Sequence, residues 1–251
     1  MSDTRVRSGG DVFTKQFLAR QRLLVVAPHA DDETAGAGGL MARVKDAGGK
    51  VFVMVMSTGD LLHFDATGKK TKKKTRRDEL AAAMDTLGVD GWEIVYEDTR
   101  LHLRLETLPR RDLADRIERS ARFSTEKTKP TMIVLPAPSY NQDHEAVYKA
   151  GLAACRPHLH SVKSFQQFVL VADAPQLSWS RATIFKPNFY VDISGKFLDQ
   201  KLKAYACHKS QVRPEPSQAG IGAIRLMAES RGREISVEAA EAYECHRFVI
   251  G

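Results

Sequence analysis

The chain has 251 residues, of which 43% are hydrophobic and 27% charged, a composition typical of a globular protein with a sizeable core. Apolar runs fall well short of the roughly 20 residues that span a bilayer, and residues 1–10 lack the apolar core of a signal peptide, so we expect a cytoplasmic protein with no membrane span. Three widely spaced cysteines without a Cys-x-x-Cys pair indicate reduced thiols rather than a disulfide framework or a cysteine zinc site.

The net charge of +7 is unevenly distributed, because residues 69–77 hold seven basic side chains in nine positions. A footprint for nucleic acid or anionic lipid is one interpretation. No aromatic residue interrupts the run, however, which favours a solvated loop and no nucleic-acid partner. Such a loop could still attract an acidic or phosphorylated small substrate.

In the first half of the chain, aliphatic runs alternate with amphipathic segments. Residues 23–27 form a buried strand that Pro28 ends, since proline cannot donate a ladder hydrogen bond. The same reasoning predicts further strands at 51–56, 92–96 and 132–136, and helices near 12–20, 39–47, 75–87, 113–123 and 145–154. A strand–helix–strand order predicts parallel pairing.

The second half of the chain is more mixed. Its patterns predict strands at 165–171, 189–193 and 248–250, and helices at 197–207, 220–227 and 237–243. We find no internal repeat and no convincing linker. The expected fold is α/β, with a Rossmann-like, mostly parallel sheet flanked by helices and a C-terminal α/β extension, in a single domain over residues 1–251.

Two polar loops follow strands that end in proline. The first contains His29 and three carboxylates within five residues, and the second, 137–144, ends in Asp143-His144. Like charges are rarely crowded at an apolar strand end, and a divalent cation would relieve the repulsion. The alternative is a polar loop in which Asp32 or Thr34 only caps the next helix. In a parallel sheet both loops lie at the carboxyl edge, which brings the second loop to the first.

These residues can be read as a catalytic metal site. His29, Asp32 and His144 would supply three ligands, and a fourth position open to water is typical of catalytic zinc. The zinc-bound water would be the nucleophile, and Asp31 would act as general base and return the proton to a leaving amine. The residues therefore predict metal-assisted hydrolysis of an amide or ester.

The same residues carry a family resemblance. Pro-His-Ala-Asp-Asp-Glu at 28–33 and Asn-Gln-Asp-His at 141–144 resemble the PIG-L/LmbE-like N-acetylglucosaminyl deacetylases, and weaker similarities extend over most of the chain. The resemblance implies a zinc enzyme with the ligands and base named above. It implies a small N-acetyl sugar or sugar conjugate as substrate, which would leave as a free amine and acetate. A homo-oligomer is one option for its assembly.

Two departures from the family pattern affect the expected roles. Ala30 replaces a proline, and Asn141 stands where many members carry a histidine credited with stabilising the oxyanion. A neutral amide is a weaker donor than imidazolium, so His208 is a candidate substitute, reaching in from the second half or from a neighbouring subunit. A surface histidine is the alternative.

By the same resemblance, Arg76 and Asp98 are candidate substrate-binding residues. An ion pair of Arg76 with Glu79, and simple turn capping by Asp98, are the alternatives. Glu33 is expected to brace the first loop rather than to contact substrate.

Other classes of function remain open from the sequence. Gly36-Ala37-Gly38-Gly39 follows the first strand like a dinucleotide-binding loop, but Met41 occupies the position that this fingerprint gives to glycine or alanine. A catalytically inactive Rossmann-like module that binds a nucleotide or nucleic acid is the remaining alternative. Bound zinc would distinguish the hydrolase from each of these.

Overall fold

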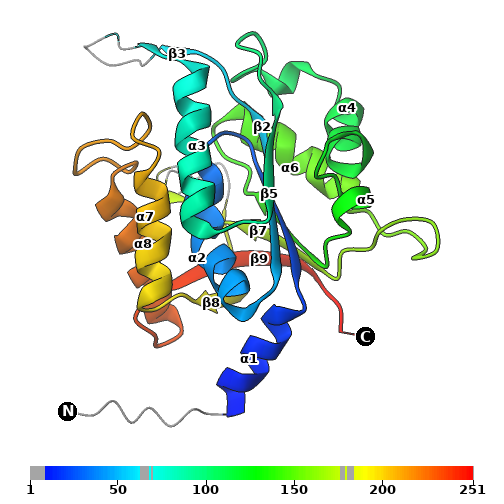
Figure 1. Ribbon diagram of the computed structural model, residues 1–251, viewed down its shortest axis with the longest axis vertical. Helices are drawn as coiled ribbons and strands as arrows, with labels where there is room; N and C mark the ends of the chain where they lie inside the picture. The colour runs from blue at the N-terminus through cyan, green and yellow to red at the C-terminus, as the bar shows by residue number, and fades with distance from the viewer. Residues whose placement is uncertain (1–8, 63–67, 69, 176–178, 180–183, 251) are drawn as a thin grey trace.

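The computed structural model describes residues 9–62, 68, 70–175, 179 and 184–250. A seven-stranded sheet runs through its centre in the order β5-β2-β1-β6-β7-β9-β8 (Figure 1). The strands in that order are Gly91–Tyr96, Lys50–Ser57, Arg22–Ala27, Met132–Pro136, Phe168–Ala172, Ala240–Phe248 and Phe189–Asp192. A separate two-stranded sheet pairs β3 (Leu61–Leu62) with β4 (Lys70–Thr71).

The sheet is mostly parallel, which confirms the predicted fold class. Strand β1 pairs in parallel with β2 and β6, so that Leu23 lies between Val51 and Met132. Strands β5 and β7 extend the parallel arrangement on either side, and β9 runs antiparallel to both β7 and β8. The continuous aliphatic runs form the central strands because helices cover both faces there.

Two layers of helices enclose the sheet (Figure 1). One buried cluster joins the sheet to α2 and α3. Helix α7 packs against both of these helices, and α8 packs against α7. On the other face of the sheet, a second buried cluster joins it to α4, η2 and α6. The helices are α1 Gly9–Ala19, α2 Asp32–Ala47, α3 Lys73–Leu87, η1 Leu105–Thr107, α4 Arg110–Asp115, η2 Arg116–Ser120, α5 Thr125–Thr128, α6 Gln142–Ala154, α7 Lys196–Ala206 and α8 Ile221–Glu234. Among them, none has the length and apolarity needed to cross a membrane.

The last two predicted elements are wrong. The strand expected at 248–250 overlaps the observed β9 only at Phe248, and Val249 and Ile250 belong to no strand. Residues 237–243 were expected to form a helix, but strand β9 begins at Ala240 and continues to Phe248. The alanines around Glu241 favour a helix locally, yet they are buried between β7 and β8, where small side chains fit a crowded sheet. Tertiary packing therefore overrides local propensity here.

The basic run is also more ordered than the predicted solvated loop. Lys70 belongs to β4, and α3 begins at Lys73, while Lys69 lies outside the described residues. Carboxylates neutralise much of the charge, through the pairs Lys72–Asp60, Lys74–Asp78 and Arg77–Glu97. Exposed pairs of this kind leave a weaker field for an acidic substrate than the sequence suggested.

The glycines of α2 serve packing. A Cβ on Gly39 would lie 2.5 Å from a side-chain carbon of Ile193. The same close approach lets Glu241 accept hydrogen bonds from the backbone amides of Gly39 (2.8 Å) and Leu40 (2.7 Å). Lys201 completes this buried group by pairing with Glu241 and donating to the carbonyl of Ala35 at 2.7 Å. Close contact of α2 with the second half of the chain thus explains the glycine-rich stretch without a nucleotide.

Candidate active site

The two polar loops meet at one edge of the sheet. His29 follows β1, and Asp32 is the first residue of α2. His144 lies in the first turn of α6, which follows β6 after the loop 137–141. Strands β1 and β6 are parallel neighbours, so their carboxyl ends place these turns side by side.

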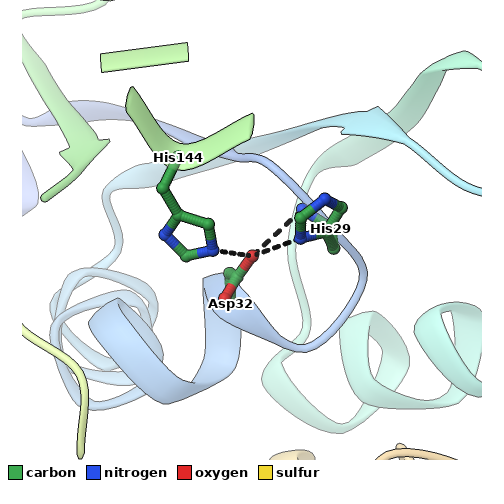
Figure 2. A group of neighbouring side chains, drawn as sticks. All are labelled: His29, Asp32 and His144. Atoms are coloured by element: carbon green, nitrogen blue, oxygen red, sulfur yellow. Dashed lines mark hydrogen bonds and ion pairs between the residues drawn. The ribbon is translucent and has the colours of Figure 1, made fainter. Parts of the chain in front are cut away.

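His29, Asp32 and His144 come together as the sequence predicts (Figure 2). One ligand atom from each lies within 4.8 Å of the other two. Asp32 Oδ2 is 3.4 Å from Nδ1 of His29 and 3.2 Å from Nε2 of His144. Two imidazole nitrogens and a carboxylate oxygen are a donor set that zinc accepts, so the cluster fits a metal site.

Asp143 orients the first ligand. Its Oδ2 lies 2.9 Å from Nε2 of His29, which leaves Nδ1 of that ring to face Asp32. The other carboxylate oxygen accepts the backbone N–H of Leu105 at 2.8 Å. A carboxylate behind a ligating histidine is common at metal sites, where it fixes the tautomer and the ring orientation. The sequence argument missed this role, because it placed Asp143 only at the end of the second polar loop, beside His144.

The ionisation of the cluster follows from its burial and its hydrogen bonds. Burial lowers the pKa of His29, but the hydrogen bonds with Asp143 and Asp32 outweigh it and raise the pKa to about 9. Burial raises the pKa of Asp32, but His144 and His29 outweigh it and hold the pKa far below its usual range. In the metal-free protein at neutral pH, His29 is therefore protonated, and its positive charge partly compensates the neighbouring carboxylates.

Asp31 lies beside the ligands but has a different environment. Burial, and then the charge of Asp32, raise the pKa of its carboxyl to about 7. It occupies the N-cap of α2 without making a side-chain capping bond, and its backbone has φ 129°. The start of α2 is thus not what holds the carboxylate of Asp31.

A pocket of about 290 Å³ opens over the cluster. Its lining includes Asp31 and the three candidate ligands together with Arg76, His102, Asn141 and Tyr205. Arg76 is only 2% exposed, and one of its amino groups donates to the carbonyl of Ala30 at 3.3 Å. Its Nε has no hydrogen-bond partner among the described residues, and Glu79 instead accepts hydrogen bonds from Ser210. This placement fits a donor to substrate better than the ion-pair alternative.

His102 is a pocket residue that sequence reasoning missed. Burial, and then the charge of Arg76, lower its pKa to about 2, so the ring is neutral. Nε2 accepts a hydrogen bond from Arg76, and Nδ1 therefore carries the proton and donates to Ser57 Oγ at 3.2 Å. The His102 ring also meets the ring of His29 edge-on, with centroids 5.3 Å apart. It thus joins the pocket arginine to the back of the metal cluster.

Of the two oxyanion candidates, only Asn141 lines the pocket. Its Oδ1 accepts the N–H of Asp143 at 3.0 Å as the N-cap of α6, so its amide group is the part left to donate toward the pocket. His208 is fully buried behind the first loop, where Nε2 lies 2.8 Å from Glu33 Oε1. This position contradicts both the expected reach into the pocket and the surface alternative.

Asp98 does not line the pocket either. Its carboxylate accepts the N–H of Arg100 at 2.9 Å and pairs with the guanidinium of the same residue. The hydrogen bonds from Arg100 lower the pKa of Asp98 to about 2. Asp98 therefore stabilises the turn after β5, which corrects its predicted contact with substrate.

Comparisons with known proteins show the family of this chain. A family model described as PIG-L, GlcNAc-PI de-N-acetylase, matches residues 24–155, which include Asp31 and all three candidate ligands. The chain is also similar to the diacetylchitobiose deacetylase of Thermococcus kodakarensis. The two are 25% identical over 240 residues, which cover 92% of this chain and 84% of that protein.

Solved structures share the fold. The conserved protein TT1542 from Thermus thermophilus superposes with a TM-score of 0.70 at 24% identity, covering 92% of this chain and 97% of that one. GalB, the 4-carboxy-2-hydroxymuconate hydratase of Pseudomonas putida, superposes with a TM-score of 0.67 at 18% identity, covering 92% and 98%. Proteins named as a deacetylase and as a hydratase are thus both similar to this chain, so the fold alone does not identify a reaction.

Proposed function

Because this chain belongs to the PIG-L family, described as GlcNAc-PI de-N-acetylase, we propose that it is a metal-dependent deacetylase of an N-acetylglucosamine-type sugar or sugar conjugate. The observation that carries the proposal is the convergence of His29, Asp32 and His144 beneath one pocket. The carboxylate of Asp31, which is not among these three candidate ligands, lies beside them. When bound there, zinc supplies Lewis acidity, which polarises a carbonyl and lowers the pKa of a water.

In this proposal Asp31 moves the proton. In the metal-free protein burial raises the pKa of its carboxyl to about 7, and a cation held by the neighbouring residues would favour the ionised form, so that the carboxylate can accept a proton at neutral pH. The carboxylate takes a proton from the attacking water and delivers it to the amide nitrogen as the C–N bond breaks. Acetate and a free amine are the products.

Neighbouring residues would orient the substrate. Arg76, held by Ala30 and His102, presents a buried guanidinium that can donate to a hydroxyl or carbonyl of the sugar. The amide of Asn141 can donate a neutral hydrogen bond to the oxygen on which negative charge develops. Neither role requires the side chain to leave its present position at the pocket.

The test is a direct assay of amine release. The protein, stripped and reloaded with zinc or with another divalent ion, is incubated with N-acetylglucosamine, its phosphate and diacetylchitobiose, and primary amine and acetate are measured. We expect equal amounts of both products. Loss of general-base catalysis costs about 10²- to 10⁴-fold, so Asp31→Asn should keep its metal and lose activity by about that factor.

Two outcomes would contradict the proposal. One is a metal-loaded protein that releases no amine from any N-acetyl sugar. The other is Asp31→Asn activity close to wild type, which would mean that another group is the base. A separate assay with a carboxylated unsaturated acid tests the alternative reaction, addition of water to a double bond. This alternative is included because a protein named as a hydratase shares the fold.

A further inference from the structure

We propose that Glu33 and His208 form a buried positioning pair that holds Asp31 in its catalytic orientation, an inference that rests on the role given to Asp31 above. Neither side chain reaches the pocket. The pair would act on the reaction by holding the backbone of Asp31.

Asp31 needs such support because its backbone is strained. Its φ of 129° lies in a region that residues with a side chain rarely adopt. Such a conformation persists only where the surroundings determine it. Here three hydrogen bonds do so. Its N–H donates to Glu33 Oε2 at 2.9 Å, and its carbonyl accepts from the Thr34 hydroxyl at 2.9 Å and from the N–H of Ala35 at 3.0 Å.

Glu33 is in turn held by His208. The carboxylate is 1% exposed and the imidazole is fully buried, with 2.8 Å between Oε1 and Nε2. A buried carboxylate requires hydrogen-bond donors, and here one oxygen meets the backbone of Asp31 while the other meets the ring. The remaining ring nitrogen, Nδ1, has no hydrogen-bond partner in the described part of the chain. The side-chain hydrogen bonding of His208 is therefore directed at Glu33.

The histidine is itself fixed at the end of α7. Its backbone N–H donates to the carbonyl of Tyr205 at 3.0 Å, and its carbonyl accepts from Gln211 at 2.8 Å. The pair thus connects the loop after β1 to a turn 175 residues later in the chain. A rigid link of this kind can hold a strained residue that local sequence would not.

The inference distinguishes positioning from simple stability. If the pair is broken, φ of Asp31 can relax, and its carboxylate rotates away from the water and the amide nitrogen. Misplacement of a catalytic group by about 1 Å can cost about 100-fold in rate. The substrate pocket and the three ligands stay in place, so kcat should fall while KM and metal content change little.

The test compares His208→Leu with His208→Gln. The amide nitrogen of Gln can occupy the place of Nε2 and donate to Glu33, whereas Leu cannot. We expect kcat to fall by about 10- to 100-fold in the Leu variant and to return to within about threefold of wild type in the Gln variant. Should the Leu variant not fold, His208→Asn replaces it, because the shorter amide mimics Nδ1 and does not reach Glu33.

Glu118→Gln is the matched control. Glu118 is a buried carboxylate paired with Lys163 and Arg156, far in sequence from the loop and absent from the pocket lining. This variant should lower the thermal midpoint without changing kcat. An equal fall in kcat in the control and in His208→Leu would mean that the effect comes from a general loss of stability, and it would overturn the inference.

Two further measurements isolate Asp31. In an Asp31→Asn background, His208→Leu should cost far less in kcat than alone, because residues that act as a unit are not additive. Hydrogen exchange of the Asp31 backbone amide should be slow in wild type and His208→Gln and faster in His208→Leu. Full additivity or unchanged exchange would refute the pair's role. The exchange result also stands if the protein deacetylates no N-acetyl sugar, so the two proposals can fail separately.

Discussion

The affinity of the three-ligand site for zinc should rise steeply with pH. In the metal-free protein the pKa of His29 is raised to about 9, because its hydrogen bonds with Asp143 and Asp32 outweigh the effect of burial. Zinc needs the unprotonated ring, so below pH 9 the metal must displace a proton. Each pH unit below 9 costs about tenfold in affinity. The cost at pH 7 is then about 100-fold, or about 2.7 kcal/mol.

The assay is competition for zinc with a chelator of known pH dependence, in steps from pH 6.5 to 9.5. A histidine with the ordinary pKa of about 6.5 would give nearly constant affinity above pH 7. Asp143→Asn is the informative variant, since loss of the carboxylate should let the affinity level off at a lower pH. Wild-type affinity that is constant between pH 7 and 9, or an Asp143→Asn profile that does not shift, would refute the reasoning.

Three other predictions follow from the same structure. His144→Ala should bind no stoichiometric zinc by elemental analysis, and full occupancy would remove it from the ligand set. The thermal midpoint of the metal-free protein should decrease as the pH is raised from 6.5 to 9. The proton on His29 stabilises the fold fully below pH 6.5 and is lost as the pH rises through 9. A midpoint that increases over this range would contradict the raised pKa of His29. Gly39→Ala should destabilise the protein in urea unfolding, because overpacking against Ile193 at about 1–3 kcal/mol exceeds the gain of up to about 1 kcal/mol from alanine in a helix; an unchanged midpoint would show that Ile193 can move.

The central strands could be predicted from sequence because burial on both faces leaves a continuous aliphatic run. Strand β1 was expected at 23–27 and occupies Arg22–Ala27, and β6 was expected at 132–136 and matches. The last strand could not be predicted, because the alanines beside Glu241 carry a helix preference that only the neighbouring strands override. The charge of Glu241 also argues against a buried strand in the sequence. In the structure this carboxylate is compensated by an ion pair with Lys201 and by hydrogen bonds from backbone amides of α2.

The metal cluster could be predicted for a similar reason. His29 lies two residues after β1 and His144 in the first turn of the helix that follows β6, so the parallel pairing of these two strands brings them together. His102 lies six residues after β5, in a loop without a recognisable motif. That loop ends at the same edge of the sheet, and the argument that linked the first two loops could have included it. Its partnership with Arg76 depends on side-chain packing and is not visible in sequence.

The candidate metal ligands and the residues that pack behind α2 come from different parts of the chain. His29, Asp32 and His144 all lie within the stretch that the family model matches, residues 24–155. The groups that hold α2 from behind lie outside it: Lys201 and Glu241 bond to its backbone, and His208 bonds to Glu33. A motif search therefore finds the residues that would bind the metal but not those that would keep the base aligned. Variation among relatives in the second half of the chain should accordingly affect turnover more than metal binding.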